Sequence, residues 1–533
     1  MKRYTLLLLM GLNSALLFGG SPQLVWHQVY GESILNQQVL VMAIDNYDNM
    51  FVAGFVDFGN YGNIIINQYD GVGLLKWNRI YTNVPTNNVI DKPVGLFPDN
   101  QAGVTMVAYV NGRAILTHLL SYDPSGILVK DVFVGDTAAG SKTYPFGVIY
   151  DGASDYYMLG QLNSVSKIFK CDNNGSVLWS APLHNDYNNE VGSINFDNYG
   201  SVVAGVLDSA TGQVMIRRYD MATGDELPAF NTHVSSLPVN DNFIKVLVDP
   251  ASNIFLAATG VDSSGRTQLV VDKFDTTGAL IVSTMCNSTK GHSNTVNSFL
   301  LDNLGDVIIS GPYADDTDAW QYGALYKVYS TGGVSWSVID SQFLVNNASA
   351  QVDIFNNVYL GTTKTPSAIS PYYSDFSFTQ LTPDSGIVVW NRSFDNSANN
   401  SGLIMQVNNF TDLFLATNTT ADTTSTWFLG RVGNGANDSV ETAIRPVSDL
   451  THDLSVFPNP FSSATNIGFT SVSNQDVTLK VYDITGRILE KQQIESVSGY
   501  NRVLVKTTLA PGVYVFNLEG GNESAVRRVV VYY

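Results

Sequence analysis

Short apolar runs bounded by turn residues follow one another along most of the chain, and the pattern returns about every 50 residues. In residues 64–81 two such runs flank a turn built on Asp70 and Gly71, and the second run carries Trp77. Apolar runs of this length, separated by Asp, Asn and Gly, are typical of β-strands joined as hairpins. The pattern therefore predicts an all-β fold made of repeated hairpins.

Each repeating unit contains two hairpins. The turns of the first hairpins start at Asp45, Asp99, Asp151, Asp197, Asp249, Asp302, Asp353 and Asn408. The turns of the second hairpins start at Asp70, Asp123, Asp172, Asp220, Asp275, Ser330 and Thr382. Four strands in a unit of about 50 residues indicate the blades of a β-propeller.

The number of turns predicts the number of blades. There are eight first hairpins but only seven complete second hairpins, because the last unit lacks an outer strand. Residues 24–31 have the sequence of such a strand, and no hairpin precedes them. We therefore expect an eight-bladed β-propeller over residues 21–432 whose N-terminal strand completes the last blade and removes two free sheet edges. A seven-bladed ring is the alternative.

Tryptophans recur at blade spacing. They are Trp26, Trp77, Trp179, Trp336 and Trp390. Because they occupy the same place in successive units, we expect them to pack between blades rather than to form a sugar-binding surface.

Three known repeats resemble these units. Residues 357–360 are similar to a repeat of bacterial seven-bladed propellers. Residues 172–179 resemble the Asp-box of sialidases, but the spacing is longer and no arginine triad is visible, so we expect a structural turn. Residues 220–224 resemble the tryptophan-docking repeat of quinoprotein dehydrogenases, but Pro228 stands where that repeat has tryptophan. We therefore expect neither a sialidase site nor a quinone site.

Residues 1–20 have the features of a signal peptide. Lys2 and Arg3 precede an apolar run that is too short to span a bilayer, and small residues follow it. No later apolar run is long enough to span, so we expect no transmembrane segment after cleavage. The net charge of −19 argues against nucleic acid and anionic membranes as partners. Cys171 and Cys286 lie two units apart and are expected to stay unpaired.

The C-terminal part of the chain loses the period. Residues 433–452 are rich in Gly, Asn and Ser and predict a linker, whereas residues 453–533 contain about seven short strands and predict a small Ig-like β-sandwich. Its landmarks are Pro458, Asn459, Pro460, Phe461, Asp483, Gly486, Arg487, Gly512 and Tyr514. In this order they resemble the type A sorting domain of the type IX secretion system of Bacteroidetes. The resemblance implies export through the periplasm by the type IX machinery, to the outer cell surface or the medium.

Few residues suggest chemistry. The six histidines are scattered, and no HExxH or paired CxxC, nucleophile elbow or phosphate-binding loop occurs. Asp315, Asp316 and Asp318 form a candidate Ca²⁺ site, because hard cations bind carboxylate oxygens; a solvated acidic loop is the alternative. We expect no other cofactor.

These features predict a non-catalytic, exported module that binds or adheres to an extracellular glycan or protein. The alternative is a polysaccharide-active hydrolase or lyase with its site in the propeller funnel. Its paired carboxylates could come from different loops, and they would be recognised as a cluster with perturbed pKa values.

Overall fold

The computed structural model describes residues 23–31, 36–57, 62–82, 91–112, 114–183, 192–208, 213–227, 232–234, 244–261, 266–286, 291–292, 296–315, 321–340, 344–365, 375–394, 399–408, 411–421, 424–433, 454–457, 461, 463–471, 474–483, 487–497, 499–520 and 523–531. Every regular element in these ranges is a β-strand, which confirms the all-β prediction. The expected signal peptide and most of the expected linker lie outside the described residues.

The first half of the repeating region forms antiparallel sheets in chain order. The first set is β2 (Asn36–Ile44), β3 (Met50–Asp57), β4 (Gly62–Tyr69) and β5 (Leu75–Tyr81). The next sheet is β6 (Lys92–Pro98), β7 (Val104–Asn111), β8 (Ile115–Tyr122) and β9 (Leu128–Val134). It is followed by β10 (Tyr144–Tyr150), β11 (Asp155–Leu162), β12 (Val165–Asp172) and β13 (Val177–Pro182). Then come β14 (Gly192–Phe196), β15 (Ser201–Asp208), β16 (Gln213–Asp220) and β17 (Thr232–Val234).

The second half continues the same arrangement. One sheet contains β18 (Lys245–Val248), β19 (Ile254–Val261), β20 (Thr267–Phe274) and β21 (Leu280–Met285). The next contains β22 (Gly291–His292), β23 (Ser298–Leu301), β24 (Val307–Asp315), β25 (Gln321–Val328) and β26 (Val334–Asp340). It is followed by β27 (Leu344–Val352), β28 (Val358–Thr365), β29 (Asp375–Leu381) and β30 (Val388–Phe394). The last strands are β31 (Asn399–Val407), β32 (Leu413–Ala421) and β33 (Thr424–Gly433).

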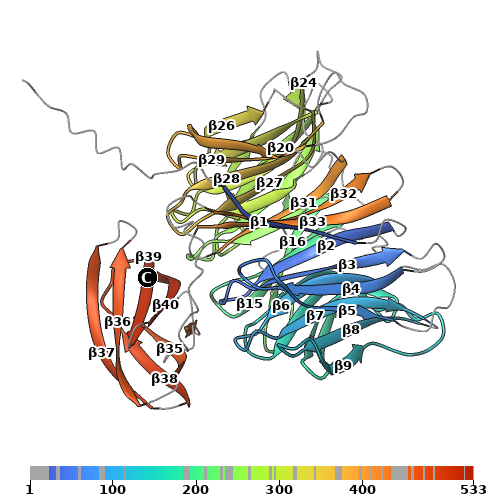
Figure 1. Ribbon diagram of the computed structural model, residues 1–533. Helices are drawn as coiled ribbons and strands as arrows, with labels where there is room; N and C mark the ends of the chain where they lie inside the picture. The colour runs from blue at the N-terminus through green and yellow to red at the C-terminus, as the bar shows by residue number, and fades with distance from the viewer. Residues whose placement is uncertain are drawn as a thin grey trace, which may run out of the picture.

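The N-terminal strand β1 (Gln23–Tyr30) pairs with the end of the repeating region rather than with its neighbours in sequence. It runs antiparallel to β33, from Gln23 opposite Gly433 to Tyr30 opposite Trp427. In Figure 1 the dark blue β1 lies beside the orange β33. This four-stranded set of β31, β32, β33 and β1 is linked to the set of β2–β5 by one parallel bridge, between Asn36 and Ser425.

The sheets are arranged in a closed series. One strand of each set, the first or, in the set that begins with the short β22, the second, contacts its counterpart in the next set. The order is β2, β6, β10, β14, β18, β23, β27 and β31, and β31 also contacts β2. We call these the inner strands, and we call the last strand of each set, including β1, the outer strand. Antiparallel four-stranded sheets that meet along their first strands make the fold propeller-like.

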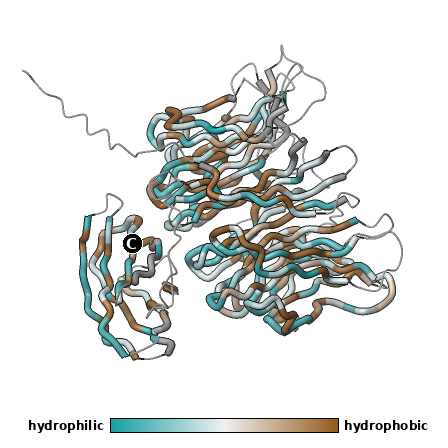
Figure 2. Tube along the Cα trace, in the orientation of Figure 1, coloured by the Kyte–Doolittle hydropathy of each residue, from teal (hydrophilic) through white to brown (hydrophobic). Residues whose placement is uncertain are grey.

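The apolar core lies between successive sheets. One cluster joins Phe51, Ile66 and Trp77 of the β2–β5 set to Met106 and Leu120 of the next sheet. The second and third strands β3 and β4 are buried on both faces because their sheet has a neighbour on either side, whereas the residues of the outer strand β5 are exposed or half-buried except for Trp77. Figure 2 accordingly shows hydrophobic residues within the strands and more hydrophilic ones at many hairpin ends.

Local turn chemistry explains where the first hairpins bend. The main-chain N–H of Asp45 donates to Asn49 O (3.0 Å), and Asp45 Oδ1 accepts the N–H groups of Tyr47 and Asn49, both at 2.8 Å. The same closing backbone bond confirms the other predicted starts, at Asp99, Asp151, Asp197, Asp249, Asp302, Asp353 and Asn408. The predicted second-hairpin start at Ser330 is wrong by one residue. That turn begins at Tyr329, whose N–H donates to Gly333 O at 3.0 Å.

The C-terminal strands form two further sheets. One contains β34 (Ser455–Phe457), β35 (Ala464–Ser471) and β38 (Gly499–Lys506), in that order. The other has the order β37 (Ile488–Ser496), β36 (Gln475–Asp483), β39 (Gly512–Gly520) and β40 (Glu523–Val531). A single buried cluster, which includes Phe469, Leu479 and Phe516, contains side chains from both sheets. These strands therefore form a two-sheet sandwich with its own core.

Candidate functional site

A buried cation near the end of the third strand links one sheet to the next. Lys327 Nζ lies 2.6 Å from Asp302 Oδ2 and 3.4 Å from Asp306 Oδ2, and it donates to Pro383 O of the following sheet at 3.2 Å. Burial by itself would lower the pKa of Lys327, but the hydrogen bond and charge of Asp302, with help from Asp306, raise this pKa above its ordinary value. Lys327 is therefore charged and bonded rather than a free base. We call this arrangement, a cation bonded to an acid of its own sheet and to a main-chain carbonyl of the next sheet, a pin.

The same pin recurs in five sets of strands, two residues before the outer turn in four of them and on β33 in the last set, which has no outer turn. Its cations are Lys170, Arg218, Lys273, Lys327 and Arg431, paired respectively with Asp155, Asp197, Asp249, Asp302 and Asp412. Each also donates to a main-chain carbonyl of the next sheet, namely those of Met221, Thr276, Ser330, Pro383 and Gly71. These residues were not predicted from the sequence. The available signal was a Lys or Arg two residues before the second turn, in a chain with few charges, and it was present for four of the five cations.

Three tryptophans reach the same carbonyls as the cations. The indole N–H groups of Trp26, Trp179 and Trp336 donate to Gly71, Met221 and Pro383, at 3.1, 3.0 and 3.0 Å. Each acceptor therefore receives one indole and one cation from the preceding sheet. At Gly71 the two donors are Trp26 of β1 and Arg431 of β33, so the last set of strands contacts the first by the same bonds as internal pairs of sheets.

Glycines in the outer turns make room for these indoles. A Cβ atom added to Gly73, Gly126, Gly224 or Gly386 would lie within 2.7 Å of the ring of Trp26, Trp77, Trp179 or Trp336, respectively. All four glycines have positive φ, which residues with a side chain rarely adopt. Trp390 packs near Tyr359, with ring centroids 6.2 Å apart, but the next set of strands has no outer turn whose glycine could approach its ring. The faces of Trp26, Trp77 and Trp336 are buried and cannot serve as a platform for sugars.

A polar cluster joins the first two sheets near their rim. Tyr81 Oη donates to Asp131 Oδ2 (2.8 Å), and His118 Nδ1 lies 2.7 Å from Asp131 Oδ1. Burial, then the hydrogen bond to Asp131, raises the pKa of Tyr81 above its ordinary value. The pKa of the nearby Asp91 rises to about 6 because the carboxyl is buried, although it accepts the N–H of Asn111 at 2.7 Å. The cluster can orient an imidazole, and it ties the outer strands β5 and β9 together.

The described aspartates with raised pKa are distributed over four sheets. Burial is the first cause in each case, and the residues are Asp45, Asp91, Asp272 and Asp353. Asp45 and Asp353 hold their own hairpin turns through the N–H groups that follow them. Asp45 and Asp353 directly follow β2 and β27, whereas Asp91 directly precedes β6 and Asp272 lies on β20.

The calcium hypothesis falls outside the described residues. Asp315 ends β24, but its side chain is not described, and Asp316 and Asp318 lie in the range that the structure omits. Within the described ranges, no group of three or more His, Cys, Asp or Glu side chains is placed to hold a metal ion. In the same ranges, no helix has the length and apolar character to cross a membrane. Cys171 and Cys286 are both unpaired, as expected.

The described landmarks of the C-terminal sandwich are Phe461, Asp483, Arg487, Gly512 and Tyr514. Phe461 is buried against Phe516, and its N–H donates to Val530 O at 3.0 Å. Tyr514 Oη donates to Ala510 O at 2.7 Å, four residues upstream. Asp483 closes its turn by accepting the N–H and the Nε–H of Arg487, both at 3.0 Å. Gly512 begins β39, whereas Pro458, Asn459, Pro460 and Gly486 are not among the described residues.

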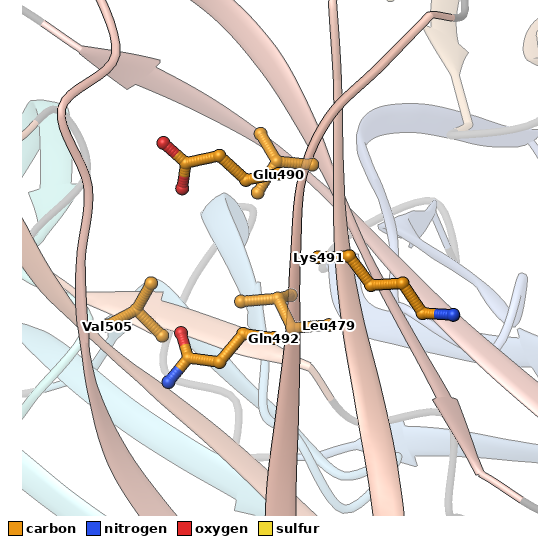
Figure 3. A pocket seen from close by; sticks show the side chains of 6 residues that line it. Leu479, Glu490, Lys491, Gln492 and Val505 are labelled. Carbon is orange, nitrogen blue, oxygen red and sulfur yellow. The ribbon is translucent and has the colours of Figure 1, made fainter.

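One hollow opens in this sandwich between the edges of its two sheets (Figure 3). Its volume is about 380 Å³. It is lined by Leu479 and Val481 of β36, by Glu490, Lys491 and Gln492 of β37, and by Val505 of β38. Apolar side chains from the core therefore lie beneath polar side chains of an edge strand.

Comparison with known proteins identifies the sandwich. The family model described as a secretion system C-terminal sorting domain matches residues 455–532. This part of the chain is a sorting domain, and the protein is secreted by the type IX system to the cell surface or the extracellular space. A comparison with curated proteins finds no match.

Solved structures with similar chains were also found. One is a protein of unknown function from Dyadobacter fermentans, with 11% identity over 77% of this chain and 99% of that chain and a TM-score of 0.40. Another is the WD40 domain of Pan2 from Neurospora crassa, with 14% identity over 64% and 91% of the two chains and a TM-score of 0.39. The WD40 domain of SCAP from fission yeast has 10% identity over 77% and 98% and a TM-score of 0.32.

Proposed function

We propose that this secreted protein is a non-catalytic binding or adhesion module whose ligand is an extracellular glycan or protein. Its binding part is an eight-bladed β-propeller over residues 21–432, which follows a signal peptide at residues 1–20. A linker at residues 433–452 joins the propeller to an Ig-like sorting domain at residues 453–533. The propeller presents the ligand-binding surface, and the sorting domain delivers it to the outside of the cell.

The junction at Gly71 carries the proposal of eight blades. It joins the strands β33 and β1 to the first sheet with one indole and one cation on a single carbonyl, as the junctions at Met221 and Pro383 do. Equivalent bonds are expected only where the spacing and angle between two blades are equivalent. The contact of β31 with both β27 and β2 supports the same closure.

The single observation that favours binding over catalysis is that the buried charged side chains are bonded within and between the sheets. The buried cations and turn acids bond one another and the main chain, so they stabilise the ring instead of facing a substrate. A hydrolase or lyase would need two carboxyls of different pKa in one site. The carboxyls with raised pKa are instead distributed over separate sheets. The Ig-like character of the sorting domain is supported by the bond from Tyr514 to Ala510 O, which resembles the tyrosine corner of that fold.

The test is a screen of the full mature chain against arrays of polysaccharides and extracellular proteins, with and without Ca²⁺. Release of new sugar ends is measured in parallel. Saturable binding without release of products supports the binding module. Turnover of any polysaccharide refutes it, and loss of binding on removal of Ca²⁺ would direct attention to Asp315, Asp316 and Asp318.

A further inference from the structure

The two lateral edges of the sorting sandwich, where the edge strands of its two sheets lie, are built differently. On one side, Phe461 forms a parallel bridge with Val531 and donates its N–H to Val530 O of β40 at 3.0 Å. The Phe461 ring is also part of the core, and β34 contacts β40 beside it. This segment covers the edge of β40, so we call it the sealed side.

The opposite side is bordered by β37 and β38, and we call it the open side. Among the described strands, β37 pairs only with β36, and β38 pairs only with β35, so each has one free edge. Across the ladder from the buried Leu479 and Val481, β37 carries the polar Gln492 and Glu490. Polar side chains do not close an apolar core, and the hollow in Figure 3 is the result.

Exposed apolar side chains gather on the same two strands. Those of the described sorting domain are Ile488, Leu489, Val497 and Leu504, with exposed fractions of 49%, 36%, 59% and 52%. The first two begin β37, Val497 directly follows it, and Leu504 lies on β38. Elsewhere in the domain, the described large apolar residues are buried or half-buried. A free edge with exposed apolar residues is the type of surface to which an extended strand adds.

We propose that the open side is the surface by which the transport machinery reads the sorting domain. The occupant is an extended segment of a type IX transport component, which pairs with the free edge of β37 and inserts an apolar side chain into the hollow. The proposal rests on the sorting role of this domain. That role requires a partner that binds the domain during export, and among the described residues the edge of β40 on the sealed side is already bonded to Phe461.

The test measures delivery of the full chain in a bacterium with a working type IX system. Leu489→Glu with Leu504→Glu places charges on the open side, and Gln492→Trp fills the hollow by a different means. Ser463→Glu is the control, because Ser463 is an exposed residue directly before β35, the central strand of its sheet, and it neither lies on β37 nor lines the hollow. A chain truncated before residue 453 reports on the sorting role itself. Melting temperatures of the purified full chains show that each variant is folded.

We expect both open-side changes to reduce the delivered fraction at least about tenfold, with folded protein retained in the periplasm, and the Ser463 variant to be delivered normally. Normal delivery of both folded open-side variants would overturn the proposal. If the truncated chain is also delivered, the sorting role itself is wrong. If truncation blocks delivery and the open-side variants do not, only the docking surface is wrong. The proposal would also be refuted if the wild type sediments as a dimer, Leu489→Glu dissociates this dimer, and delivery is unchanged. That result would assign the open side to a second copy of the chain.

Discussion

Replacing Trp26 with alanine tests the closure of the ring directly. Trp26 is 8% exposed, its Nε1–H donates to Gly71 O at 3.1 Å, and its ring stacks on Tyr69 with centroids 6.3 Å apart. Removing a buried tryptophan costs about 3–5 kcal/mol, which includes the cavity it leaves. This is a large part of the ~5–15 kcal/mol that stabilises a typical domain.

The expected shift in melting temperature follows from the size of the propeller. An unfolding entropy of about 2.1 cal/mol/K per residue, over roughly 400 residues, gives about 0.85 kcal/mol/K. Trp26→Ala should therefore lower the melting temperature by about 4–6 °C, measured by calorimetry on the full chain. Val29→Thr is the control, because Val29 lies on the same strand but is 60% exposed. Its effect should stay within about 0.5 kcal/mol. If Trp26→Ala shifts the transition no more than Val29→Thr does, β1 does not close the ring.

Three further predictions concern the pin at Lys327, the buried carboxyl of Asp91 and the outer turn at Gly126. Lys327→Met leaves Asp302 and Asp306 buried without their cation, and it should lower the unfolding free energy in urea by about 3–5 kcal/mol. Lys76→Met, at an exposed lysine, should be close to neutral. Equal effects of the two substitutions would contradict the role of Lys327. The pKa of Asp91 is about 6 when folded and close to 4 when unfolded, so the folded state binds more protons between these values and stability falls as pH rises through this window. The unfolding free energy of the wild type should therefore fall by about 2–3 kcal/mol between pH 4 and 6 because of this group, and Asp91→Asn should abolish that fall. Parallel pH profiles of the wild type and the variant would refute this. Gly126→Ala should destabilise by more than Gly152→Ala in thermal unfolding. Both glycines have similar positive φ, but only at Gly126 would the new Cβ meet an indole, at 2.5 Å; equal costs would show that strain alone acts.

The turn acids could be assigned from the sequence because their chemistry is local. Asp45 bonds N–H groups two and four residues ahead, so the residue type and the turn occur together. The error at Ser330 has the same origin. Tyr329 starts that turn through its main chain alone, and no acidic side chain marks the position.

The cations could not be assigned in this way. Lys327 bonds Asp302 of the preceding hairpin and Pro383 O of the next sheet, residues that are distant in sequence and adjacent only after the sheets stack. The free edge and the hollow of the sorting domain also depend on stacking. Alternation along β37 does not reveal that its neighbour on one side is missing.

The sequence by itself determined the strands, the period, the turns and the sorting tail, because each depends on residues close together in the chain. The sequence also predicted that the N-terminal strand completes the last blade, and the pairing of β1 with β33, some 400 residues away, confirms it. Only the tertiary structure decided that one carbonyl at Gly71 receives Trp26 and Arg431. It also decided which side of the sorting sandwich is sealed by Phe461 and which is open. The physical reason is that these contacts join segments that are far apart along the chain. Neither segment carries a local sequence pattern that identifies its partner.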